Sequence, residues 1–143
     1  MDKPHPPRLF LDANVLFSAA YSSEGRSHAL FELARENVCL LISSRYAFEE
    51  AERNLLMKNP EVMKRFYLLM KQIRFIPEGP PQMQQKAQAL RLHPEDSPIL
   101  AAAVGHADLL VTGDRKHFGP WFGKTMLGLK IQSLAEALKM LLH

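Results

Sequence analysis

The stretch Leu9-Phe10-Leu11-Asp12 decides the fold, and Leu109-Leu110-Val111-Thr112-Gly113-Asp114 follows the same pattern. In each, a short β-prone apolar run ends in polar residues, which is typical of a strand buried in a parallel sheet. In open α/β sheets, ligands bind just beyond the carboxyl ends of the strands. We therefore expect Asp12 and Asp114 to lie at the same edge of one sheet.

Strand-like and helix-like segments alternate along the rest of the chain. Strands are predicted at residues 8–12, 38–42, 75–76, 109–112 and 129–131. Helices are predicted at residues 14–20, 27–36, 45–58, 61–71, 81–92, 99–107 and 134–142, with caps at Ser27, at Ser43 or Ser44, and at Ser133. This alternation predicts an α/β fold of three layers, in which helices cover both faces of a central parallel sheet.

Length and composition limit the class of protein. The 143 residues are enough for one domain, residues 1–143, in which the polar, proline-rich residues 1–7 form a flexible lead-in. No apolar run reaches membrane-spanning length, so no membrane partner is expected. The single cysteine, Cys39, lies in an apolar run and is expected to be buried and inert, which fits a cytoplasmic protein. The formal net charge of +3 permits a polyanionic partner.

Two further acids are candidates for the same sheet edge. Asp96 precedes an alanine-rich segment, Leu100-Ala101-Ala102-Ala103, which would pack closely on the sheet and hold the aspartate near the strand ends. Glu50 follows the second strand and sits beside Ala51, near the apolar stripe of its helix, whereas Glu49 points further outward. Glu50 is therefore the fourth candidate, with Glu49 as the fallback.

Each of these acids also has a purely structural interpretation. Asp12 and Asp96 can cap helices, and Asp114 follows a glycine in good turn chemistry. Glu50 can belong to a solvated charge cluster on its helix. The convergence of all four decides in favour of a site, because carboxylates gathered at one edge repel one another unless a cation lies between them. Hard oxygen ligands suit Mg²⁺ or Mn²⁺, which serve phosphodiester hydrolysis by activating water and neutralising charge on phosphate.

Four segments of the chain resemble the PIN-domain family, the fold of the VapC-type toxin ribonucleases. They are residues 9–16, 42–51, 96–103 and 110–114, which occur in the family's order along most of the chain. The resemblance implies a Rossmann-like sheet and a Mg²⁺- or Mn²⁺-dependent endoribonuclease, which hydrolyses RNA phosphodiester bonds to leave a 5′-phosphate and a 3′-hydroxyl. A small antitoxin protein is the partner expected for a toxin of this type.

The resemblance also implies roles for individual residues. The catalytic and metal-site acids are Asp12, Glu50, Asp96 and Asp114, and the polar residues that support them are Asn14 and Thr112. Arg115 and Lys116 adjoin the last acid and are expected to contact the RNA backbone. His117 is a less favoured contact for substrate phosphate. Because the six histidines show no paired metal-ligand spacing, a zinc-type site is not expected.

Two alternatives remain open at this stage. A non-catalytic member of the same fold that binds RNA or a partner protein would carry the same residues. A receiver-type signalling domain also places acids at a sheet edge, but it needs an acidic pair near the first strand and a lysine after a late strand. Here Asn14 stands near Asp12, and no lysine directly follows Thr112.

One helix carries an apolar stripe that is relevant to oligomeric state. Met63, Phe66, Tyr67 and Met70 fall at helical spacing. They are expected either in the core or on a surplus apolar face that forms a homodimer contact.

Overall fold

The computed structural model describes residues 5–143, so residues 1–4 of the predicted lead-in lie outside the described residues, and residues 5–7 form no helix or strand. The described chain forms a six-stranded sheet in the order β3-β2-β1-β4-β6-β5. The strands are β1 (Arg8–Leu11), β2 (Leu40–Ser44), β3 (Arg74–Ile76), β4 (Leu109–Val111), β5 (Thr125–Met126) and β6 (Leu129–Gln132). All neighbouring strands pair in parallel except β5 and β6. The predicted parallel sheet is confirmed, with one antiparallel edge strand that was not predicted.

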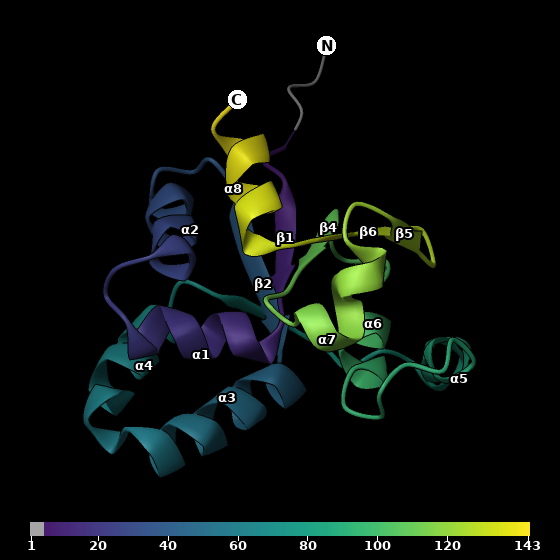
Figure 1. Cartoon of the computed structure of the whole chain (residues 1–143), viewed down its shortest axis with the longest axis horizontal. Helices are drawn as coiled ribbons and strands as arrows, with labels where there is room; N and C mark the ends of the chain where they lie inside the picture. Colours follow the sequence, from purple (N-terminus) through teal and green to yellow (C-terminus); the bar gives the residue numbers. More distant parts are fainter. Residues whose placement is uncertain (1–4) are drawn as a thin grey trace.

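Helices flank this sheet and complete a three-layer α/β/α fold. They are α1 (Ala13–Tyr21), α2 (Arg26–Arg35), α3 (Arg45–Lys58), α4 (Met63–Met70), α5 (Pro81–Gln88), α6 (Ser97–Ala103), α7 (Arg115–Phe118) and α8 (Leu134–Leu141), with short 3₁₀ turns η1 (Pro60–Val62) and η2 (Gly119–Trp121). α2 packs against α8, whereas α6 packs against α5, β2 and β4. Figure 1 shows α1, α3 and α4 gathered beyond the carboxyl ends of β1 and β2. In the part of the chain that the structure describes, no helix is long and apolar enough to span a membrane.

Helix caps explain several of these boundaries. Ser44 begins α3 because its side chain accepts a hydrogen bond from the backbone N–H of Ala47. Ser133 and Glu136 form a reciprocal capping box at the start of α8. The prediction that Ser27 caps α2 is wrong, because the helix begins one residue earlier and Ser27 is buried in its first turn.

Residues with positive φ lie at three element boundaries that differ from the predicted ones. Asn37 has a φ of 64°, and this turn delays β2 until Leu40 rather than residue 38. Arg91, with a φ of 58°, lies in the turn that follows α5, and Gly105, with a φ of 87°, lies in the turn that follows α6. Both helices are therefore shorter than the sequence pattern predicted.

The apolar stripe of α4 belongs mainly to the core. Met63, Phe66 and Met70 are buried, whereas Tyr67 is 43% exposed. The four residues therefore do not form the surplus apolar face considered for a homodimer, because three of them pack inside the molecule.

Gly79, in the loop between β3 and α5, allows a close approach to α6. A Cβ atom added at Gly79 would lie 2.5 Å from the carbonyl oxygen of Ala101 and 2.9 Å from its Cβ. We expect Gly79→Ala to lower the free energy of unfolding by about 1–3 kcal/mol, because backbone atoms have to shift to relieve the overlap. Urea denaturation measures this change.

Gly119→Ala is the matched control for this substitution. Gly119 has helical dihedral angles, and the atom nearest to an added Cβ would be the Cβ of Arg115, at 3.9 Å. Its free energy of unfolding should stay within about 0.5 kcal/mol of the unchanged protein. Equal effects of the two substitutions would contradict the packing argument.

Candidate metal centre

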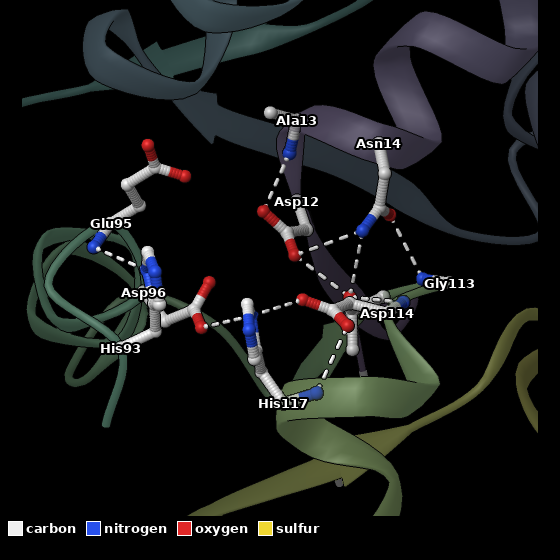
Figure 2. A network of polar contacts seen from close by, with 10 residues as sticks. Asp12, Ala13, Asn14, His93, Glu95, Asp96, Gly113, Asp114 and His117 are labelled. Atoms are coloured by element: carbon white, nitrogen blue, oxygen red, sulfur yellow. Dashed lines mark hydrogen bonds and ion pairs between the residues drawn. The ribbon is translucent and has the colours of Figure 1, made fainter. Parts of the chain in front are cut away.

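Four carboxylates line one pocket at the predicted sheet edge. Asp12 directly follows β1, Asp114 is the third residue after β4, Asp96 precedes α6 and Glu50 lies within α3. The pocket has a volume of about 260 Å³, and its other lining residues are Ala13, Asn14, Phe17, Asn54, Lys58, Glu95 and His117. Figure 2 shows the side chains of Asp12, Asp96 and Asp114 directed toward one shared space. The fold therefore brings together the four acids that the sequence singled out.

Asp12 is held by hydrogen bonds on both carboxylate oxygens. Its side chain is almost fully buried, at 4% exposure. Oδ1 accepts from the backbone N–H of Ala13 at 2.7 Å and so caps α1. Oδ2 accepts from the hydroxyl of Thr112 at 2.7 Å. Asp12 therefore caps α1 and also lines the acidic pocket, so both interpretations of this residue from the sequence apply.

Asn14 and Thr112 join the ends of β1 and β4 around this carboxylate. The side-chain oxygen of Asn14 accepts from the backbone N–H of Gly113 at 2.9 Å, and its amide nitrogen lies 3.4 Å from Oδ2 of Asp12. The hydroxyl oxygen of Thr112 accepts from the backbone N–H of Asp114 at 3.0 Å. These bonds fix the relative positions of Asp12 and Asp114, as Figure 2 shows.

Asp114 and Asp96 differ in their structural roles. Asp114 caps α7, because its Oδ1 accepts from the backbone N–H of His117 at 3.0 Å. Asp96 precedes α6 but makes no capping hydrogen bond, although its side chain is buried, at 7% exposure. Its Oδ2 has no hydrogen bond from any described residue. Helix capping therefore explains Asp114 but not Asp96.

The structure distinguishes Glu50 from its neighbour Glu49. Glu49 is exposed and accepts from Nε of Arg45 at 2.8 Å, so it belongs to a surface ion pair. Glu50 lines the acidic pocket. Burial, followed by the negative charge of Asp12, raises the pKa of Glu50 to about 7. Glu50 rather than Glu49 is the fourth acid of the pocket.

The electrostatics of the pocket fit a hard divalent cation. Burial and the nearby Asp12 raise the pKa of Asp96 to about 6, and burial also raises the pKa of Asp12. Within residues 5–143, no lysine or arginine forms an ion pair with the four acids. The basic side chain that contacts them there is that of His117, which lies close to Asp96 and Asp114. A set of carboxylate oxygens with excess negative charge is the donor set that Mg²⁺ and Mn²⁺ prefer.

Several residues of the pocket were not predicted as site residues. Asn54 and Lys58 line it beside Glu50. The three residues are spaced four apart on α3 and therefore share a helix face, which is a sequence signal for their position. The predicted contacts Arg115 and Lys116 are exposed and do not line the acidic pocket.

Comparison with known proteins establishes the family. The profile of the PIN domain matches residues 8–116, so the chain belongs to the PIN-domain family. This match excludes the alternative of a receiver-type signalling domain. No curated protein sequence matches the chain.

Solved structures of low sequence identity share the fold. The VapBC2 complex from Rickettsia felis, bound to a DNA fragment from its promoter, has a TM-score of 0.66 at 15% identity, over 88% of this chain and 98% of that one. DNA-bound VapBC from Salmonella typhimurium has a TM-score of 0.69 at 13% identity, over 90% and 98%. A protein from Pyrobaculum aerophilum has a TM-score of 0.68 at 16% identity, over 96% and 98%. The predicted Rossmann-like, VapC-like fold is confirmed.

The raised pKa of Glu50 makes stability depend on pH. The folded protein favours the neutral form of the Glu50 carboxyl more than the unfolded chain does. The resulting contribution to the free energy of unfolding is fully present below the ordinary pKa of 4.5 and is lost as pH rises through about 7. Without divalent ions, we expect the free energy of unfolding to fall between pH 5 and about pH 8. Glu50→Gln should reduce this fall.

Urea denaturation in the presence of a chelator, repeated across this pH range, measures the effect. Glu49→Gln is the matched control, because it removes an exposed carboxylate from the adjacent position. Its pH profile should parallel that of the unchanged protein. A Glu50→Gln profile that also runs parallel would rule out this carboxyl as a source of the pH dependence.

Proposed function

We propose that this protein is a Mg²⁺- or Mn²⁺-dependent endoribonuclease that hydrolyses RNA phosphodiester bonds. The observation that carries the proposal is the convergence of four carboxylates on one pocket, where no lysine or arginine among the described residues forms an ion pair with them. Membership of the PIN-domain family and the likeness to VapBC structures support it. A buried acidic cluster of this kind is otherwise destabilising, because like charges repel.

The four acids would hold the metal ion, and the residues around them set their orientation. Such an ion, when bound, lowers the pKa of water and neutralises the charge that develops on phosphate. The backbone N–H of Ala13 and the hydroxyl of Thr112 each occupy one acceptor position on Asp12. A carboxylate has about four such positions, so Asp12 can still bind a cation while it is held in place.

Lys58 and Phe17, which line the pocket, and Tyr21, which stacks on Phe17, suit a single-stranded substrate. Lys58 places its Nζ 5.5 Å from the ring centre of Phe17, and Phe17 stacks on Tyr21 with centroids 5.3 Å apart. Tyr21 is 51% exposed. Aromatic faces and a neighbouring cation bind the bases and the phosphates of single strands. Lys58, rather than Arg115 or Lys116, is therefore the substrate contact that we favour.

The proposed partners follow from the solved relatives and from the surface. The VapBC structures contain a toxin with its antitoxin, and we propose a small antitoxin protein that covers the acidic pocket in a cytoplasmic complex. A homodimer contact is proposed for the exposed apolar side chains of α3 and α4, which are Leu56, Met57, Tyr67 and Leu68. The alternative function is a PIN domain that binds RNA or protein without cleaving RNA.

Asp12→Asn tests the proposed activity. It should lower the rate of RNA cleavage at least about a hundredfold, because it removes a charge that holds the ion. The side chain keeps its shape, so the thermal midpoint should not fall. Cleavage of single-stranded and structured RNAs with Mg²⁺ or Mn²⁺ measures the activity.

Asp108→Asn is the matched control, because Asp108 is exposed and pairs with Arg8. It should retain full activity. A fully active Asp12→Asn protein would refute the assigned role, and an unchanged protein that binds RNA without cleaving it would favour the non-catalytic alternative.

Lys58→Gln tests the substrate contact. Measured by fluorescence anisotropy in the Asp12→Asn background, it should weaken binding of single-stranded RNA. It should also reduce the slope of log affinity against log salt by about 0.7, the value for one phosphate contact on a single strand. Lys139→Gln on α8, outside the pocket lining, should change neither quantity. An unchanged salt slope for Lys58→Gln would exclude the phosphate contact.

A further inference from the structure

We propose that His93, Asp96 and His117 form a second metal site, which overlaps the acidic pocket at Asp96 and His117 and binds a divalent transition-metal ion of the zinc class. One ligand atom from each of these residues lies within 4.8 Å of the others. The proposal does not rest on nuclease activity. It concerns a different donor set, in which two imidazole nitrogens accompany one carboxylate.

The fold brings the two histidines together from separate segments. His93 lies in the loop between α5 and α6, and His117 lies in α7. Their rings stack with centroids 4.5 Å apart and planes inclined by 14°. Figure 2 shows His117 beside the carboxylate of Asp96, with His93 next to both. Spacing along the chain, which argued against a zinc-type site, does not reveal this proximity.

An independent observation points to a cation at this place. Nδ1 of His117 lies 3.1 Å from Oδ2 of Asp96 and 2.8 Å from Oδ2 of Asp114. One ring nitrogen has at most one hydrogen to donate, so it cannot serve both carboxylates. Oδ2 of Asp96 is buried and has no hydrogen bond from any residue within 5–143. A buried acceptor without a partner is costly, and a bound cation would remove that cost.

The donor set determines which ion fits. Imidazole suits zinc, copper, iron and nickel, whereas magnesium prefers oxygen ligands throughout. Two histidines and one carboxylate, with a position left open, are the protein ligands of several catalytic zinc sites. The acidic pocket and this site therefore differ in the ion they select, although they share Asp96. An ion in either site changes the affinity of the other, and the effect is reciprocal.

A small movement of His93 completes the site. Zinc–nitrogen bonds of about 2.1 Å require ligand atoms no more than about 4 Å apart, so separations of up to 4.8 Å have to close, and the stacked rings have to tilt. His93 is exposed. Its Nδ1 accepts a long hydrogen bond, 3.3 Å, from the backbone N–H of Glu95, and this contact is weak enough to give up.

Calorimetric titration of the full chain with Zn²⁺ alone tests the site. We expect one ion to bind, and His93→Gln and His117→Gln each to weaken binding at least about tenfold, because each removes a ligand and even changes beside a ligand cost that much. His106→Gln is the matched control, because His106 is another exposed histidine, and its affinity should be unchanged. Thermal midpoints without metal show whether each variant folds.

Two further measurements separate this site from the acidic pocket. Asp12→Asn should retain Zn²⁺ binding even where it abolishes RNA cleavage, because Asp12 is not one of the three ligands. His93→Gln should leave Mg²⁺ binding unchanged. Equal Zn²⁺ affinity of His93→Gln and His106→Gln would overturn the proposal, as would loss of Zn²⁺ binding in Asp12→Asn to the extent seen in His93→Gln.

Discussion

Repulsion among carboxylates that the fold itself brings together is the constraint on which the rest of the structure depends. Parallel strands β1 and β4 end at one edge and deliver Asp12 and Asp114, while α6 and α3 add Asp96 and Glu50. Hydrogen bonds from Thr112 and backbone amides offset part of the repulsion. Burial, followed by the negative charge of Asp12, raises the pKa of Glu50 to about 7 and that of Asp96 to about 6.

The rigidity of the sheet is what allows this arrangement to persist. The side chain of Asn14 bonds across to the backbone of Gly113, and the hydroxyl of Thr112 bonds to the carboxylate of Asp12. These contacts join residues that directly follow two adjacent strands, so they constrain where the carboxylates of Asp12 and Asp114 lie. A preformed pocket binds an ion with little reorganisation.

The sequence predicted those features that local patterns determine. Buried apolar runs identified β1 and β4, and the pattern through Asn59-Pro60 placed the bounds of α3 correctly. β5 was missed because Leu127 and Gly128, both with positive φ, make the two-residue turn to β6 without the usual Asn-Gly pair. The proximity of His93 and His117 depends on how separate segments pack, which no spacing along the chain reveals.

Asp12 and Asp114 each begin a helix as well as line the pocket, whereas Asp96 makes no capping bond and Glu50 lies within a helix turn. Selection for a stable fold alone would therefore preserve the first pair in descendants that no longer hold an ion. The second pair would be free to drift in such lineages. Across relatives of this chain, the persistence of Asp96 and Glu50 is thus the more informative record of a working site.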